Sequence, residues 1–335
     1  MTRSAIVTGL GIYLPEKTVT NQDIEEILNR PGLAVKLKEK IGIENRHVMA
    51  DDETTSDLAA HASREALTRA GLSPEDLDLI ILSTDTPDHI SPATSATIQH
   101  KLGAYNAGTF DINAACAGMV TALDVGSRYI QTDEEINNVL VIGAYGMTKF
   151  LDWTDYYTCT AFGDAAGAMV LSVSDKPGFL VSKMMAEGYY HDYFGIYFGG
   201  TANPPTSKGI ENKEHFLRYL KPYPPDINLQ KWPPLINACL TKINKTPGDV
   251  DWFFFTQVNL RIIEAVMKKL NVPLEKTHNV MQKWGYTGSA CVPLAMYDAI
   301  DQGRLQPPGQ GNGELIVLCT SGVGANYAAA ALNWR

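Results

Sequence analysis

The chain repeats one short pattern at two places about half its length apart, and this repeat constrains the fold more than any other feature. Cys159–Ala168 and Cys319–Ala328 each place a cysteine and small residues just before an apolar run typical of a strand. The turns around Cys116 and Cys291 form a second matching pair, because each opens an apolar stretch. Such self-similarity is typical of a duplicated structural unit. We therefore expect two related halves whose equivalent turns meet at one common site.

Strand-like and helix-like segments alternate along the chain, which predicts a layered α/β fold with covered sheets. Runs rich in Ile, Val and Leu predict strands at 4–10, 78–84, 108–113, 137–143 and 166–173, and helical patterns occupy 54–71, 93–103 and 117–131. We divide the halves into 1–175 and 176–335. Within the second half, the aromatic and proline-rich segment 178–235 predicts a strand pair followed by a long irregular excursion.

Composition and charge exclude several classes of protein. The 335 residues are 45% hydrophobic and 19% charged, as in soluble globular proteins, and the net charge of −9 argues against nucleic-acid binding. No apolar run is long enough to span a bilayer, and the N-terminus lacks the pattern of a signal peptide. The five cysteines and seven histidines show neither disulfide density nor metal-ligand spacing. We expect a cytoplasmic protein without a metal.

Cys116 is the strongest candidate for a catalytic residue. It lies in a turn of small residues that opens the helical pattern after residue 117. The positive end of a helix dipole lowers the pKa of a cysteine and favours the thiolate, so we expect a nucleophile that carries an acyl group. The alternative is a small, tightly packed hydrophobic residue. The glycine-rich turn 322–324 offers backbone N–H groups for an oxyanion beside Cys116, although it is also consistent with a plain turn at the end of a strand.

Four motifs, taken in order, resemble the β-ketoacyl-acyl-carrier-protein synthase III family over nearly the whole chain. They are Ala114–Gly118, Phe162–Ala168, Gln257–Ile263 and Thr287–Pro293. The resemblance implies a thiolase-type fold of five layers (αβαβα) built from two pseudo-symmetric halves, usually a homodimer. It also implies that Cys116 is acylated by an acyl thioester, and that the thioester oxygen is bound by the backbone N–H groups of Cys116 and of Gly322 or Gly324.

Two positions depart from that family. Thr256 stands where the family has a histidine, and Tyr286 stands where it has an asparagine. In the family these two residues stabilise the enolate formed when malonyl thioester loses carbon dioxide. Donors to such a charge are each worth roughly a hundredfold or more in rate. We therefore expect acylation of Cys116 to persist and ordinary malonyl condensation to be slow or absent, with Thr256 and Tyr286 as neutral hydrogen-bond donors.

The residue that replaces the missing base is left open by the sequence. Cys319 resembles the base cysteine of thiolases, and the alternative is a buried strand cysteine. His278 precedes the Tyr286 turn, and a structural role is the alternative there too. His89 and His191 lie in segments that border the expected tunnel.

The resemblance also indicates which molecules the chain binds. Ile90 matches the family residue that reaches into the partner's acyl pocket, and Asn259 and Arg261 lie in the motif at the tunnel mouth. Arg261, Lys268 and Lys269 form a basic patch that suits an acyl carrier protein, or a solvated helix face. Residues that bind coenzyme A in the family are replaced. We expect no cofactor other than the phosphopantetheine of acyl-carrier-protein or acyl-CoA substrates.

Three functions are consistent with these residues. The first is an acyltransferase or noncanonical condensing enzyme that passes the acyl group from Cys116 to an unusual acceptor, in fatty-acid-like or specialised-metabolite biosynthesis. The second is an ordinary 3-oxoacyl-acyl-carrier-protein synthase III. The third is a non-catalytic partner subunit of a related ketosynthase, in a heteromer. Retention of the intact Cys116 turn counts against the third.

Overall fold

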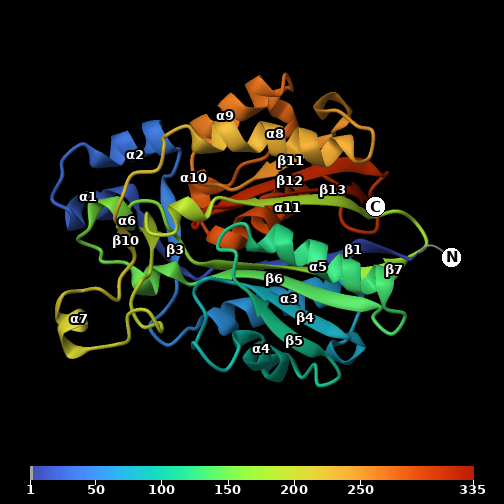
Figure 1. The fold of residues 1–335 in the computed structure, drawn as a ribbon, viewed down its shortest axis with the longest axis horizontal. Coiled ribbons are helices and arrows are strands. Elements are labelled where there is room, and N and C mark those ends of the chain that lie inside the picture. The colour runs from blue at the N-terminus through green and yellow to red at the C-terminus, as the bar shows by residue number, and fades with distance from the viewer. Residues whose placement is uncertain (1–2) are drawn as a thin grey trace.

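Two β-sheets form the centre of the molecule in a computed structural model that describes residues 3–335 (Figure 1). The first sheet has the order β1-β7-β6-β4-β5 and the second has the order β11-β12-β13-β8. The strands of the first sheet are β1 (Ser4–Tyr13), β4 (Leu79–Ser83), β5 (Gly108–Ile112), β6 (Asn138–Tyr145) and β7 (Ala165–Ser174). Those of the second are β8 (Phe179–Ala186), β11 (Trp252–Phe255), β12 (Glu314–Gly322) and β13 (Asn326–Trp334).

The two sheets repeat one pairing pattern, which confirms the duplication expected from the sequence. In the first, β4 is parallel to β6, and β7 is antiparallel to both β6 and β1. In the second, β11 is parallel to β12, and β13 is antiparallel to both β12 and β8. The order β1-β7-β6-β4 therefore recurs as β8-β13-β12-β11. A lone parallel bridge from Phe253 to Thr277 takes the place of the β4–β5 pairing.

Helices cover both faces of each sheet, so the chain forms the five layers of a thiolase-type fold. Between the sheets lie α5 (Gly118–Thr132) and α11 (Cys291–Asp301); α5 packs against strands of both sheets. The outer layers are α3 (Thr55–Ala70) with α4 (Thr94–Leu102), and α8 (Ile227–Thr241) with α9 (Leu260–Lys269). Figure 1 shows these two pairs on opposite sides of the molecule. No helix within residues 3–335 combines the length and apolar character that crossing a bilayer requires.

The remaining elements gather at one end of the sheets, on the left of Figure 1. They are α1 (Asn21–Ile27), α2 (Leu33–Ile41), α6 (Tyr156–Cys159), α7 (Ser207–Glu211), α10 (Met281–Trp284) and the ribbons β2 (Lys17–Thr20) with β3 (Asn45–Val48) and β9 (Phe194–Gly195) with β10 (Arg218–Tyr219). Short 3₁₀ turns occupy Pro74–Asp76, Met147–Phe150, Gly188–Tyr190, Pro247–Asp249, Leu274–Lys276 and Gly288–Ala290. This end of the molecule carries the cavity described below.

The segment 178–235 differs in part from the sequence prediction. Its first strand, β8, pairs with β13 from the end of the chain and not with a neighbouring hairpin strand. Its last residues begin α8, which contains Pro233 and Pro234 in its interior. Proline removes an N–H donor and normally breaks a helix. Here the carbonyl of Leu229, four residues before Pro233, accepts a hydrogen bond from Lys269 Nζ of α9 instead (3.1 Å).

Candidate active site

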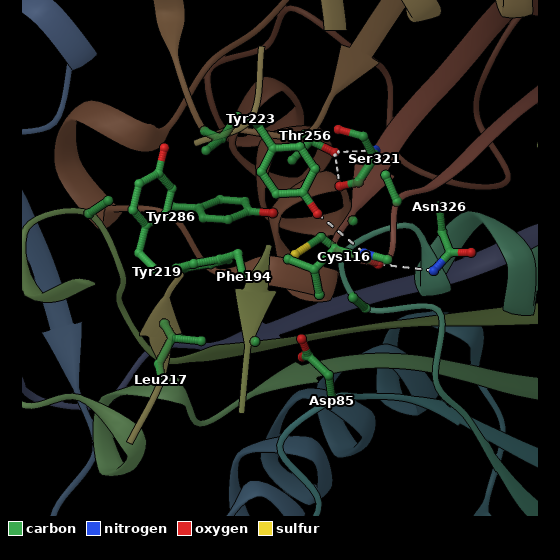
Figure 2. A pocket seen from close by; sticks show the side chains of 18 of the residues that line it. Asp85, Cys116, Phe194, Leu217, Tyr219, Tyr223, Thr256, Tyr286, Ser321 and Asn326 are labelled. Carbon is green, nitrogen blue, oxygen red and sulfur yellow. Dashed lines mark hydrogen bonds between the residues drawn. The ribbon is translucent and has the colours of Figure 1, made fainter. Parts of the chain in front are cut away.

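A cavity of about 770 Å³ opens at the end of the sheets and is lined by residues from both halves of the chain. Its wall includes Cys116 and Asp85 from the first half and Thr256, Tyr286 and the turn 321–327 from the second. The segment 191–228 covers one side with aromatic and apolar side chains, among them Phe194, Leu217, Tyr219 and Tyr223 (Figure 2). The equivalent turns of the two halves therefore meet at one site, as the internal repeat predicts.

Cys116 lies in a strained turn between β5 and α5. The Asn113 side-chain oxygen accepts a hydrogen bond from the Ala115 N–H (3.1 Å), and Ala115 has a positive φ of 47°. A non-glycine residue rarely adopts this conformation, which costs about 1–3 kcal/mol. Gly118 lets the helix begin close to β4, because a Cβ there would lie 2.1 Å from Ser83 Oγ. The turn thus holds the sulfur at the cavity wall, directly before α5.

The environment of Cys116 differs from the sequence-based expectation of a lowered thiol pKa. The residue is 5% exposed, and burial raises its pKa well above the ordinary value. The charge of Asp85 raises the pKa further, whereas a hydrogen bond with the Tyr286 hydroxyl opposes the increase. Removal of the sulfur from water outweighs the helix dipole. The expectation of a low thiol pKa in the free protein is therefore wrong, and the thiol is protonated at neutral pH.

The glycine turn after β12 touches the Cys116 backbone. A Cβ at Gly322 would lie 2.7 Å from the Cys116 nitrogen and 2.8 Å from the Ala114 oxygen, so only glycine fits there. Gly324 also lines the cavity, but its N–H donates to the Tyr223 hydroxyl (3.4 Å). The structure thus brings both predicted oxyanion-hole glycines to the cavity, and the N–H of Gly324 is already engaged.

Substituting Gly322 by alanine is expected to push this turn away from Cys116. The overlap is with backbone atoms, which cannot rotate aside, so we expect a loss of about 1–3 kcal/mol in the free energy of unfolding, measured by chemical denaturation. Gly188→Ala is the matched control, because a Cβ there would meet nothing within 4 Å. Equal stability of the two variants would show that the turn has room to move.

Thr256 is at the site but is not available as a donor. It is 1% exposed; its hydroxyl donates to the Ser321 carbonyl (3.4 Å) and accepts from the Ser321 N–H (2.9 Å). A hydroxyl has one proton to donate. Thr256 therefore ties the end of β11 to the end of β12, and the expectation that it donates to substrate is not supported by this geometry.

Tyr286 takes a different position from that of a small amide side chain. Its ring is buried against Phe162 and Tyr145, with ring centroids 5.5 Å and 6.3 Å away. Its hydroxyl points toward the Cys116 sulfur in Figure 2. Burial raises the pKa of this phenol well above its ordinary value, and the Cys116 thiol raises it further. Tyr286 is thus a neutral phenol directed at the sulfur itself.

Asp85 is a site residue that sequence reasoning missed. It follows β4 and lines the cavity, where its carboxylate points toward Cys116 from the side opposite Thr256 and Ser321 (Figure 2). Burial raises its pKa to about 6. The signal in the sequence was a carboxylate just after an apolar parallel strand, because ligands in α/β folds bind beyond the carboxyl ends of such strands.

The partly buried charge of Asp85, one of whose carboxylate oxygens is enclosed, is expected to lower stability as the pH rises. Its pKa is 3.8 when exposed and about 6 when folded, so folding favours the protonated acid. The cost is absent below about pH 4 and complete above about pH 7, where it reaches about 3 kcal/mol. The gap in unfolding free energy between Asp85→Asn and the parent protein should therefore widen across this interval in urea titrations. A gap that is independent of pH would contradict the assignment.

Three of the predicted site residues lie away from the cavity wall. Cys319 is fully buried in β12, and burial raises its pKa well above the ordinary value; the nearby Cys239 of the outer helix α8 raises it further. Cys319 does not line the cavity, so the prediction that it acts as a base at the site is not supported. Ile90 is 83% exposed on the surface, and Arg261 lies on α9 beside a separate groove. Asn259 does line the cavity, and its side chain caps α9 by accepting from the Arg261 N–H (3.0 Å).

The histidines do not supply an obvious base. His278 is buried between Asp298 (2.6 Å) and Arg304 (2.7 Å), away from the cavity wall, which matches the structural role considered for it. His89 is exposed and outside the cavity lining. His191 lines the cavity but is exposed there. Within residues 3–335, Asp85 is therefore the one carboxylate on the cavity wall.

Comparisons of the sequence agree with the motifs. A profile described as 3-oxoacyl-(acyl-carrier-protein) synthase III matches residues 110–188, and the profile of that family's C-terminal part matches 240–334. The β-ketoacyl-(acyl-carrier-protein) synthase III of Xanthomonas campestris pv. campestris is 35% identical over 334 residues, covering 98% of each chain.

Solved structures show the same relationship. The 3-oxoacyl-(acyl-carrier-protein) synthase III of Aquifex aeolicus superimposes with a TM-score of 0.85 at 33% identity, over 98% of this chain and all of that one. The priming β-ketosynthase of the R1128 polyketide pathway has a TM-score of 0.87 at 29% identity, over 100% and 97% of the two chains. This chain belongs to the 3-oxoacyl-(acyl-carrier-protein) synthase III family.

Proposed function

We propose that this protein is an acyltransferase or noncanonical condensing enzyme that loads an acyl group onto Cys116 and passes it to an acceptor other than malonyl thioester. One observation carries the proposal: the nucleophile turn is intact, while the Thr256 hydroxyl is bonded to Ser321 and the Tyr286 hydroxyl points toward the Cys116 sulfur. Neither hydroxyl is placed as the free donor that an enolate requires.

Loading exchanges one thioester for another. The Cys116 sulfur attacks the carbonyl carbon of the donor, the carbon–sulfur bond to the donor breaks, and the thiol proton goes to the departing donor thiol. Backbone N–H groups stabilise negative charge on the carbonyl oxygen. We assign this role to the N–H of Cys116 and to the 322–324 turn, because Gly322 lies directly against the Cys116 backbone. Tyr286 keeps its proton at neutral pH and can donate to the sulfur as charge develops there.

The second half-reaction releases the acyl group to the acceptor. For an alcohol or amine, the acceptor atom bonds to the carbonyl carbon, the bond to Cys116 breaks, and the acceptor proton returns to the sulfur. No carbon dioxide leaves and no enolate forms on the enzyme, so this chemistry does not need the missing histidine and asparagine. An already activated carbon nucleophile would satisfy the same geometry.

We further propose that the donor is an acyl carrier protein or acyl-CoA and that the working form is a cytoplasmic homodimer. The groove at Arg261 and Lys268 on α9 supports an acidic carrier, since basic side chains are favourable partners for its phosphate and its acidic surface. The relatives are named as synthases that use the acyl carrier protein, and these names support the same class of donor.

Intact-protein mass spectrometry tests the proposal in two steps. The protein is first incubated with a panel of acyl-CoA and acyl-carrier-protein thioesters, and the adduct is mapped by peptide digestion. The acylated protein is then chased with malonyl carrier protein, or with small amines and alcohols. We expect an adduct confined to Cys116 that malonyl carrier protein discharges slowly. Rapid formation of 3-oxoacyl product would instead establish the ordinary synthase, and failure of every donor to label the protein would favour a non-catalytic partner subunit.

A further inference from the structure

The carboxylate of Asp85 is unusual because one of its oxygens is enclosed without a partner. Asp85 Oδ1 is shielded from solvent, and no other residue within 3–335 donates a hydrogen bond to it; only the backbone N–H of Asp85 itself lies near the carboxylate. Among residues 3–335, no lysine or arginine lines the cavity, so no ammonium or guanidinium group of the described wall balances the charge there. An unpaired buried acceptor is costly, and a bound molecule that donates to it recovers the cost.

Asp85 also lies close to the place where the acyl group would be held. Its charge acts on both the Cys116 thiol and the Tyr145 hydroxyl. Figure 2 shows the carboxylate directed at the Cys116 side of the cavity. The same cavity wall carries apolar side chains, among them Met147, Phe194 and Leu217. Among the described residues that line the cavity, Asp85 is the one carboxylate, so it is the anionic acceptor available to an acyl chain on the sulfur.

We propose that Asp85 is a specificity residue that selects acyl groups bearing an N–H or O–H donor a few carbons from the carbonyl. This inference rests on the proposed acylation of Cys116. A protonated amine matches the charge of the carboxylate, and a hydroxyl supplies a neutral hydrogen bond. Sites built to bind a polar group reject the analogue that lacks it, because the site's own polar atom is then left unpaired.

Three matched thioesters test the selection. Butyryl, 3-hydroxybutyryl and 3-aminobutyryl N-acetylcysteamine differ only at the third carbon, and the rate of Cys116 labelling is followed by intact mass. We expect the hydroxy or amino compound to label the parent protein about a hundredfold or more faster than butyryl. The two polar compounds separate a hydroxyl-selective site from an ammonium-selective one. Equal or faster labelling by butyryl would overturn the proposal.

Substitutions separate a role in selection from a role in the chemistry. Asp85→Asn should remove the preference for the amine, and Asp85→Ala should make butyryl the best of the three. Asp88→Asn is the matched control: Asp88 lies outside the cavity lining and accepts from the Ser56 N–H (3.0 Å), so the order of rates should be unchanged. An equal loss with all three thioesters in both Asp85 variants would contradict selection and indicate a catalytic base.

A binding measurement keeps the inference testable even if the proposed function fails. Amide analogues of the three thioesters cannot acylate the protein, and their affinities for Cys116→Ala are measured by calorimetry. Tighter binding of the amino or hydroxy analogue, lost in Cys116→Ala/Asp85→Ala, supports the role of Asp85 without any acylation. Indistinguishable affinities for the three analogues would refute it.

Discussion

Cys116→Ala is expected to abolish labelling by every acyl thioester, the largest effect that any single substitution should have on this protein. The sulfur is the only atom of the turn that can form the thioester bond, and alanine leaves nothing to replace it. The substitution removes only the sulfur atom from a side chain that is 5% exposed, so alanine fits in the same turn. The variant should therefore keep its fold by circular dichroism while acyl adducts fall below detection in intact-protein mass spectra.

Cys319→Ala serves as the control for this experiment. Cys319 is equally buried but lies in β12 on the side of α8, so labelling of this variant should match the parent. If Cys116→Ala were still labelled at the parent rate, another residue would be the acyl carrier. If Cys319→Ala lost labelling while remaining folded, the base role predicted from the sequence would have to be restored.

The double substitution Thr256→His with Tyr286→Asn is expected to raise malonyl-dependent condensation about a hundredfold or more. The histidine and asparagine restore donors to the malonyl carbonyl, and each such donor is typically worth a factor of about a hundred or more in rate. Replacing Tyr286 by the smaller asparagine also clears space beside Cys116, because the Tyr286 hydroxyl points toward the sulfur. Formation of 3-oxoacyl product and release of carbon dioxide are the measurements.

The two single variants are the controls for this gain. Thr256→His alone must break the hydrogen bonds between Thr256 and Ser321, so it should lower stability without a matching gain in condensation. Tyr286→Asn alone provides one donor of the pair. A double variant that folds, accepts an acyl group and still fails to condense would show that the acceptor pocket, and not the missing dyad, excludes malonyl thioester.

The layered fold followed from local patterns in the sequence. Alternating apolar strands and helical segments predicted β1, β4, β5, β6 and β7 and the helices α3, α4 and α5 to within a few residues. The repeat around Cys159 and Cys319 predicted two related halves. These properties are local, because strand and helix periodicity and turn composition depend on neighbouring residues. In 187–226 the chain crosses the surface with little regular structure, and contacts with distant elements decide its course.

The nucleophile was likewise evident from its turn of small residues, and the family motifs identified Thr256 and Tyr286 as replacements. The sequence did not reveal which groups those two side chains contact, because Ser321 and Cys116 are distant from them in sequence.

The burial of the site residues also depends on contacts between segments that are distant in sequence. The thiol pKa of Cys116 rises because both halves of the chain exclude water from it, which outweighs the local helix dipole that the sequence displays. Asp85 became a site residue only when the end of β4 was placed against the Cys116 turn. Local periodicity depends only on neighbouring residues and can be predicted from them. Desolvation and charge pairing depend on which distant segments come together in the folded protein.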